Sequence, residues 1–187
     1  EFKIPVIVLD RPNPNGHYID GPVLDKKFTS FVGMHPVPIV HGMTVGEYAR
    51  MINGEGWLAG KLKCDLRIIP MTGYDHTSYY KLPVKPSPNL PNMKSVYLYP
   101  SLCLFEGTPV SIGRGTDMPF QIVGHPDYVS GTFEFVPKSI EGASKYPKLE
   151  GRTCFGINLA DAPVEDIRKN SGLRLKWLLD FFNALPD

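Results

Sequence analysis

Three loops of the chain carry the side chains best suited to chemistry. They cover residues 10–14 (D-R-P-N-P), 41–44 (H-G-M-T) and 106–116, which runs from E-G-T to R-G-T. Each loop combines charged or hydrogen-bonding groups with glycine or proline, a composition typical of shaped loops that carry function. We therefore predict that the three loops line one polar active-site cleft.

Asp10 and Arg11 directly follow the apolar run at residues 4–9 (I-P-V-I-V-L). A continuous β-branched run of this kind is typical of a parallel strand buried on both faces. Ligands of open α/β sheets bind beyond the carboxyl ends of the strands, so this position favours a substrate-binding role. The alternative is that the two charges brace the loop while Asn13 turns it.

His41 precedes a predicted helix that begins near Thr44. A helix N-terminus offers free N–H groups and the positive end of the helix dipole. His41 could therefore hydrogen-bond a substrate hydroxyl or transfer a proton, or it could only anchor the loop. Thr44 and Glu47 fit a capping box, which explains Glu47 without any substrate. A substrate role for Glu47 is the alternative.

Glu106 and Arg114 are the candidates in the third loop. Glu106 follows an apolar run and could act as a general acid, or as an ordinary hydrogen-bond acceptor in its loop. Arg114 lies between Gly113 and Gly115, which leave its backbone open to close approach. A guanidinium binds carboxylates in a bidentate way, so Arg114 could recognise an anion. The alternative is a solvated arginine on a surface turn.

Four carboxylates lie in or near these loops: Asp10, Glu47, Glu106 and Asp117. Glycoside hydrolysis usually needs a pair of them, so the set suits that reaction. The sequence contains no G-x-S-x-G elbow, no Walker loop and no H-E-x-x-H motif. Its five histidines have no ligand spacing, so we expect no catalytic metal. The pattern favours a hydrolytic α/β enzyme.

The elements that must position these loops can be read from hydrophobic periodicity. We expect the sheet of the strand at 4–9 to lie largely upstream of this sequence. Residues 10–25 and 83–91 are predicted to be loops. The other predicted elements are helices at 44–53 and 93–104, strands at 66–71, 120–123, 131–136 and 154–159, and a last helix opening at Ser171. The apolar face of that helix is predicted to consist of Leu173, Trp177, Leu178, Phe181, Phe182 and Leu185.

Composition excludes several classes of protein. The 187 residues carry a net charge of +1 without a basic stripe, which argues against nucleic acid as a partner. No apolar run approaches the roughly 20 residues of a membrane span. With 42% hydrophobic residues a real core can form, so the 19 prolines and 18 glycines indicate shaped loops and not disorder. The three cysteines are far apart and form no disulfide framework or metal knuckle.

Five motifs occur in order along the chain: V-L-D-R-P-N-P at 8–14, H-G-M-T-V-G-E at 41–47, P-S-P-N-L-P at 86–91, E-G-T at 106–108 and G-R-G-T-D-M-P-F at 113–120. In this set the chain resembles the exo-β-N-acetylmuramidase family of the NamZ type. The resemblance runs to at least residue 126. It implies an enzyme without a cofactor that releases N-acetylmuramic acid from the non-reducing ends of peptidoglycan fragments.

The resemblance also implies a domain organisation. Residues 1–33 would form the end of an N-terminal Rossmann-like parallel-sheet domain and its linker. Residues 34–187 would form a C-terminal mixed α/β domain that lines the active-site cleft. The family's candidate acid, the glutamate of a Pro-Glu-His-Gly motif, has no counterpart in this sequence. We therefore expect the main acid upstream, and the isolated chain could be inactive.

The site residues implied by the resemblance fall into two groups. His41 and Glu47 are assigned to catalysis, and the substrate-binding set is Asp10, Arg11, Asn13, Thr44, Ser87, Asn89, Glu106 and Arg114. A peptidoglycan substrate implies a periplasmic or secreted protein. Two other functions stay open, namely a non-catalytic carbohydrate-binding module and a different hydrolase such as an amidase or phosphatase.

Overall fold

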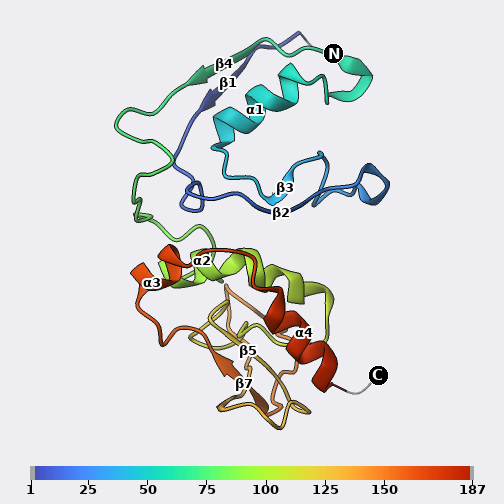
Figure 1. Cartoon of the computed structure of the whole chain (residues 1–187), viewed down its shortest axis with the longest axis vertical. Coiled ribbons are helices and arrows are strands. Elements are labelled where there is room, and N and C mark those ends of the chain that lie inside the picture. Colours follow the sequence, from blue (N-terminus) through green and yellow to red (C-terminus); the bar gives the residue numbers. More distant parts are fainter. Residues whose placement is uncertain (1–2, 186–187) are drawn as a thin grey trace. The chain divides into compact units, whose positions relative to one another are not determined.

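The computed structural model describes residues 3–185 and divides into two compact units. Unit 1 is Glu1–Tyr80 and unit 2 is Lys81–Asp187. The order of the elements along the chain can be followed in Figure 1. The domain boundary after residue 33 that the resemblance implies stays a prediction. In the structure, the segments 45–54 and 66–69 contact the strand at 6–9 within unit 1.

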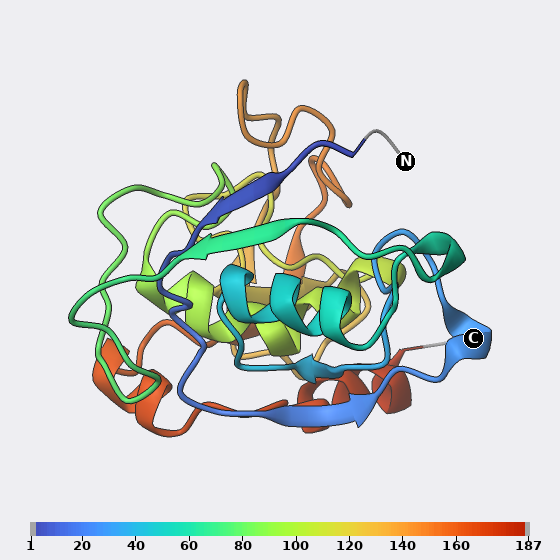
Figure 2. The ribbon, with the colours of Figure 1, turned by 90° about the horizontal axis from the view of Figure 1, so that it is seen from above.

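Unit 1 contains a parallel and an antiparallel strand pair. Strand β1 (Val6–Leu9) pairs in parallel with β4 (Leu66–Ile69), and β2 (Asp20–Val23) pairs with β3 (Pro38–Val40) in the antiparallel sense. Helix α1 (Val45–Gly54) contacts both β1 and β4, and Figure 2 shows it alongside this pair. A parallel pair needs a crossover connection, and α1 lies within it.

The parallel strand at the start of the chain is confirmed, but its predicted burial is wrong. Ile7 is 59% exposed and Leu9 is 73% exposed. Among residues 3–185, β4 is the one strand that pairs with β1. One neighbouring strand and one helix do not cover both faces of an apolar strand, so its side chains stay accessible.

Unit 2 is built on an antiparallel sheet of three strands in the order β5-β7-β6. The strands are β5 (Ile122–His125), β6 (Phe133–Phe135) and β7 (Cys154–Asn158). Its helices are α2 (Met93–Leu102), α3 (Val164–Lys169) and α4 (Leu175–Ala184). The main core combines α2, α4 and the sheet: Leu98, Leu102, Phe105, Val110, Ile112, Phe120, Val123 and Phe181.

Most elements predicted by periodicity are present within a few residues. The helices at 44–53 and 93–104, the four later strands and the irregular segment at 83–91 are confirmed. Strands β2 and β3 and helix α3 were not predicted, and β2 lies inside the segment taken as a loop. The described chain therefore has a mixed α/β fold with parallel and antiparallel sheets.

The last helix, α4, begins later in the sequence than predicted. This helix begins at Leu175 and not at Ser171. The backbone N–H of Arg174 donates to Ser101 Oγ at 2.9 Å, outside the helical hydrogen-bond pattern.

Within residues 3–185, no helix is long and apolar enough to cross a membrane. The three cysteines are all free thiols.

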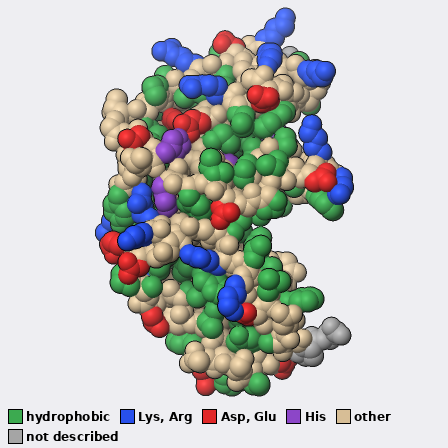
Figure 3. All heavy atoms as spheres, viewed as in Figure 1, with side chains coloured by type: hydrophobic (Ala, Val, Ile, Leu, Met, Phe, Trp, Pro, Cys, Tyr) green, Lys and Arg blue, Asp and Glu red, His purple; other side chains and the backbone are tan. Residues whose placement is uncertain are grey.

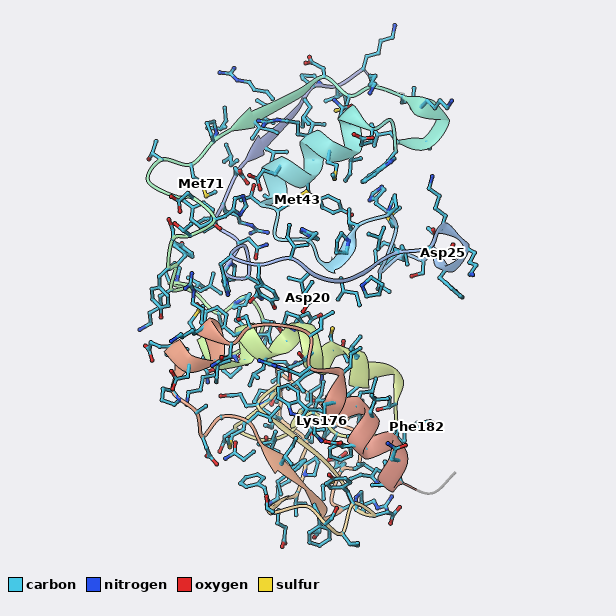
Figure 4. All side chains as sticks on the ribbon, viewed as in Figure 1. Asp20, Asp25, Met43, Met71, Lys176 and Phe182 are labelled. Carbon is cyan, nitrogen blue, oxygen red and sulfur yellow. The ribbon has the colours of Figure 1, made fainter. Side chains whose placement is uncertain are left out.

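Helix α4 packs on the core with only part of its predicted apolar face. Phe181 is 1% exposed, and Trp177, Leu178 and Leu185 pack against the same core. Phe182 is 78% exposed and projects from the helix (Figure 4), so its assignment to the packed face is wrong. Adjacent helical residues point about 100° apart, which lets one phenylalanine enter the core while the next meets solvent.

This pair of phenylalanines provides a matched test of the core. We expect Phe181→Ala to lower the free energy of unfolding of unit 2 by about 3–5 kcal/mol, the usual loss for a buried phenylalanine. Phe182→Ala should change it by no more than about 0.5 kcal/mol, as exposed positions do. Urea denaturation followed by tryptophan fluorescence measures both. Equal losses would contradict the packing of α4.

Candidate active site

The Asp10 carboxylate connects the end of β1 to the start of α1. Thr44 Oγ1 donates to Asp10 Oδ2 at 2.8 Å, and the backbone N–H of Gly46 donates to Asp10 Oδ1 at 2.8 Å. The backbone N–H of Arg11 also donates to Oδ1, at 2.9 Å. The carboxylate thus satisfies a free N–H at the helix N-terminus, where negative charge is favoured.

This contact requires a glycine at position 46. A Cβ on Gly46 would lie 2.7 Å from Asp10 Cγ and 2.8 Å from a methyl carbon of Ile68. Partial burial of the Asp10 carboxyl opposes ionisation, but the hydrogen bonds from Gly46, Thr44 and Arg11 outweigh it and lower the pKa. Asp10 is therefore ionised at neutral pH and holds the loop to the helix.

The predicted capping box of α1 is confirmed. The backbone N–H of Thr44 donates to Glu47 Oε2 at 2.8 Å, and the backbone N–H of Glu47 donates to Thr44 Oγ1 at 3.2 Å. The second carboxylate oxygen, Oε1, lies 3.0 Å from His76 Nε2. Capping therefore uses one oxygen of Glu47, and the other belongs to an ion pair.

His76 is a site residue that the sequence analysis missed. Its Nε2 faces Glu47, and its Nδ1 lies 3.0 Å from the carbonyl oxygen of Gly16. The Glu47 carboxylate raises the pKa of His76, and the Gly16 carbonyl adds to this effect against partial desolvation. Burial works against ionisation of Glu47, but the Thr44 and His76 hydrogen bonds lower its pKa. The two side chains form an ion pair when His76 is protonated.

The pKa of His41 is shifted in the opposite direction to that of His76. Burial lowers its pKa, so the ring is neutral near pH 7. The backbone N–H of Met43 donates to His41 Nδ1 at 3.1 Å, which leaves the proton on Nε2. The ring stacks on Tyr48 with 5.0 Å between centroids. His41 therefore offers one N–H donor from a fixed orientation.

Asn13 braces the first loop. Its Nδ2 donates to the carbonyl of Met43 at 2.9 Å, and its Oδ1 accepts from the backbone N–H of Asn15 at 2.9 Å. These bonds match the loop-turning alternative considered for this residue. The Arg11 side chain is exposed. Substrate contact by either side chain stays a prediction.

Two cavities of unit 1 share Glu47 and His76. The first, of about 480 Å³, is also lined by His41, Met43 and the segment 16–19. The second, of about 320 Å³, is also lined by Asp10, Thr44, Arg50, Ile68, Pro70, Met71, Tyr74 and Asp75. Met43 and Met71 are labelled in Figure 4. Histidine and acidic side chains gather on the face shown in Figure 3.

In unit 2, Glu106 and Arg114 form an ion pair between their Oε1 and Nη2 atoms. The Arg114 guanidinium carbon lies 5.0 Å from the centre of the buried Phe120 ring, a cation–π contact. Lys148 donates to the carbonyl oxygens of Phe105, Glu106 and Thr108 at 3.3, 2.8 and 2.5 Å. Glu106, Arg114 and Lys148 line a cavity of about 330 Å³.

The glycines around Arg114 serve the turn itself. Gly113 and Gly115 have φ angles of +77° and +84°, which favour glycine. A Cβ at Gly113 would lie 2.5 Å from the carbonyl oxygen of Met118, and one at Gly115 would lie 2.6 Å from that of Lys138. The close approach that the sequence suggested is made by the protein's own backbone, and it fixes the direction of Arg114.

The P-S-P-N-L-P motif is held by hydrogen bonds within unit 2. The backbone N–H of Asn89 donates to Ser87 Oγ at 3.2 Å. Asn89 is buried, and its Nδ2 donates to the carbonyl of Ala143 at 3.0 Å. These contacts give both residues a structural role in unit 2, and their predicted contact with substrate stays a prediction.

The structure thus brings the predicted site residues together in two groups. Asp10, Thr44 and Glu47 meet in unit 1, and Glu106 meets Arg114 in unit 2. A single cleft formed by both groups stays a prediction. Within the described part of the chain, no cluster of three His, Cys, Asp or Glu side chains could hold a metal ion.

These features define the class of the protein: a mixed α/β fold whose loops hold carboxylate, imidazole and guanidinium groups around polar cavities. Residues 1–94 match the family model "Exo-beta-N-acetylmuramidase NamZ, N-terminal", and residues 97–180 match the corresponding C-terminal model. The chain belongs to this NamZ family.

Individual relatives agree with this assignment. The chain is 39% identical over 174 residues to the peptidoglycan beta-N-acetylmuramidase NamZ of Bacillus subtilis, which covers 85% of the chain and 41% of that protein. The crystal structure of a DUF1343 family protein from Bacteroides fragilis matches the chain with a TM-score of 0.93 and 54% sequence identity. The match covers 97% of this chain and 51% of the chain of that protein.

A second DUF1343 family structure from Bacteroides fragilis has the same fold, with a TM-score of 0.69 at 24% identity. The match covers 95% of the chain and 50% of that protein. The chain therefore spans about half, or somewhat less, of the length of these relatives.

The Asp10 contacts predict a pH-dependent contribution to stability. Asp10→Asn should lower the free energy of unfolding at pH 7 by about 1–3 kcal/mol, because it leaves a buried donor poorly paired. The folded-state pKa of Asp10 is lowered, so this contribution is present above the unfolded pKa of about 3.9 and disappears as pH falls through the folded value.

Urea denaturation of wild type and Asp10→Asn between pH 3 and 7 measures this difference. The gap between the two proteins should narrow towards pH 3. Asp25→Asn is the matched control, since Asp25 accepts from the backbone N–H of Lys27 but is exposed, and its effect should be smaller. A gap for Asp10→Asn that stays constant with pH would contradict the charged contact.

Proposed function

We propose that this chain forms part of an exo-β-N-acetylmuramidase, a glycoside hydrolase that releases N-acetylmuramic acid from the non-reducing ends of peptidoglycan fragments. The observation that carries the proposal is the match of residues 1–94 and 97–180 to the two NamZ family models. The 39% identity to the peptidoglycan beta-N-acetylmuramidase of Bacillus subtilis supports it. The carboxylates around the cavities of unit 1 suit glycoside chemistry.

Within this reaction, Glu47 acts as an ionised carboxylate. Hydrolysis passes through a transition state with positive charge on the sugar ring, and it needs both a protonated acid and a carboxylate. The hydrogen bonds that Glu47 accepts lower its pKa against the effect of burial, which favours the role of the carboxylate over that of the acid. Glu47 instead stabilises the positive charge or orients the attacking water. The main acid would then come from a residue outside this sequence.

His41 assists by hydrogen bonding. Its neutral ring carries the proton on Nε2 and lines the larger cavity of unit 1. A neutral N–H donor on the cavity wall suits a sugar hydroxyl or an acetamido oxygen. Asp10 and Thr44 hold the helix N-terminus in place, and Thr44 is buried. Their contribution to substrate binding is therefore mainly to keep Glu47 in position.

Arg114 is proposed to read the lactyl carboxylate that distinguishes N-acetylmuramic acid from N-acetylglucosamine. The guanidinium is fixed by Glu106 on one side and by the Phe120 ring on another. The cavity that it lines is also lined by Lys148 and Glu106, so two cations and one carboxylate contribute to its wall. The excess positive charge favours an anionic group. Arg11 is the second candidate for this role.

The proposal has two further parts, which concern the fold of the larger domain and the location of the protein. The parallel β1–β4 pair with α1 in its crossover supports a Rossmann-like arrangement for the larger domain to which it would belong. Because peptidoglycan lies outside the cytoplasmic membrane, we propose that the protein acts in the periplasm or outside the cell.

Release of free N-acetylmuramic acid tests the proposed function directly. We expect the whole protein to cleave a chromogenic N-acetylmuramic acid glycoside and to release the sugar from peptidoglycan fragments. Glu47→Gln keeps an acceptor oxygen for the cap but removes the charge, so kcat should fall about 10²- to 10⁴-fold. Binding of fragments without release would contradict an enzyme and support a binding module. Wild-type activity in Glu47→Gln would leave Glu47 structural.

Arg114 is tested by substrate comparison. Arg114→Ala should lower kcat/KM for the muramic glycoside by about 1.5–3 kcal/mol in free-energy terms, the usual worth of a hydrogen bond to a charged group. The corresponding N-acetylglucosamine glycoside should be hardly affected, because it lacks the carboxylate. Arg152→Ala, which removes an exposed arginine of the same unit, is the matched control. An equal loss of kcat/KM on both sugars in Arg114→Ala would contradict carboxylate recognition.

A further inference from the structure

The Glu47–His76 pair forms part of the wall of both cavities in unit 1. Both side chains remain accessible, with exposed fractions of 40% for Glu47 and 46% for His76. A ligand in either cavity can therefore reach the pair. His76 lies 29 residues after Glu47, in a loop that belongs to none of the five family motifs.

Each carboxylate oxygen of Glu47 has its own donor. Oε2 accepts from the backbone N–H of Thr44 at 2.8 Å, and Oε1 lies 3.0 Å from His76 Nε2. Two donors on opposite oxygens fix the plane of a carboxylate, whereas one donor leaves it free to rotate. Thr44 is buried within the cap of α1, so His76 is the accessible half of this arrangement.

The His76 ring is itself anchored at both nitrogens. Nδ1 faces the carbonyl oxygen of Gly16 at 3.0 Å, and a carbonyl can only accept. Nε2 faces a carboxylate, which also accepts. Both contacts are hydrogen bonds only when both nitrogens carry protons, that is, when the ring is an imidazolium. The neutral ring must give up one of the two.

The Gly16 anchor is rigid. The backbone N–H of Gly16 donates to the carbonyl of Asn13 at 2.9 Å. A Cβ on Gly16 would lie 2.8 Å from the Tyr74 hydroxyl and 3.1 Å from the carbonyl oxygen of Gly42. The carbonyl that holds His76 is thus part of a closely packed turn, and it can serve as a fixed support for the ring.

We propose that His76 is a positioning residue which, as an imidazolium bridging Gly16 and Glu47, holds the Glu47 carboxylate in its working orientation between the two cavities. This inference rests on the proposed muramidase function and adds to it a residue outside the family motifs. His76 acts through Glu47, and its protonation decides whether the ring bridges both Gly16 and Glu47 or hydrogen-bonds to only one of them.

Glu47 raises the pKa of His76, and other titratable groups line the same two cavities. Around the second cavity, hydrogen bonds lower the pKa of Asp10 and Asp75, and burial raises that of Tyr74. In the first cavity, burial lowers the pKa of His41. His17 and Tyr18 also line that cavity. Replacing His76 alone distinguishes its effect on the pH profile from theirs.

The sign of the pH effect follows from the raised pKa of His76. The bridge is complete below the folded-state pKa and is lost as pH rises through it. Activity should therefore fall on the alkaline side as His76 loses its proton. A residue with a purely structural role in the loop would not impose this profile.

The test uses His76→Gln in the whole protein. Glutamine keeps one amide donor for Glu47 but has no charge and cannot bridge to Gly16. We expect kcat for the muramic glycoside to fall up to about 100-fold, as small misplacements of a catalytic group do, with KM within about two-fold. The midpoint of the alkaline limb of the kcat profile should change, because the limb that remains in His76→Gln reports the main acid alone. Lys27→Gln, which removes an exposed cation from the same unit, is the control and should leave kcat and the profile unchanged.

An NMR titration of the His76 ring provides a readout that needs no activity. Its pKa should fall towards the ordinary histidine value of about 6.5 in Glu47→Gln. An unchanged pKa in that variant, or a wild-type alkaline limb in His76→Gln, would overturn the inference while the muramidase activity itself stands. Absence of N-acetylmuramic acid release from the wild-type protein would overturn the proposed function, and with it any role of His76 in that reaction.

Discussion

The architecture of unit 1 depends on one carboxylate at one helix end. Asp10 is the first residue after β1, and it accepts from Thr44 and Gly46 at the start of α1. Because position 46 has no Cβ, the carboxylate approaches the helix closely enough to receive its free N–H. The same contact places Thr44 so that its own backbone and hydroxyl can fix Glu47. The strand, the helix and the site residue are thus linked through a single charged group.

Unit 2 fixes its charged residue by different means. Arg114 lies between two glycines with positive φ, so the path of the turn is decided by close backbone contacts. Its guanidinium then lies near the ring of Phe120, which is part of the hydrophobic core. Unit 1 orients an anion with helix N–H groups, and unit 2 orients a cation with packing and a carboxylate. Both arrangements reduce the freedom of the charged group before any ligand binds.

Interactions between residues close together in the sequence could be predicted, whereas those between distant residues could not. The capping box of Thr44 and Glu47 spans three residues and was visible as a pattern, and so were the periodic helices. The Glu47–His76 pair joins residues 29 positions apart, and nothing in the spacing of single residues indicates it. The sequence also did not predict correctly which apolar side chains are buried. The apolar character of Leu9 and Phe182 does not show whether other residues cover them. Asp10 and Asn13 were predicted to be site residues, but the sequence does not show which atoms they contact.

The electrostatics of the described chain bear on how the reaction would be divided among residues. Each carboxyl group whose pKa is clearly shifted, namely Asp10, Asp25, Glu47 and Asp75, is shifted downwards. Such groups stabilise positive charge well and donate protons poorly. A glycosidase needs both functions at once, with two carboxyl groups whose environments push their pKa values apart. Glu47, held by a helix N-terminus and an imidazolium, has the environment of the ionised partner. Its acidic counterpart must then come from a carboxyl in a drier setting with fewer donors.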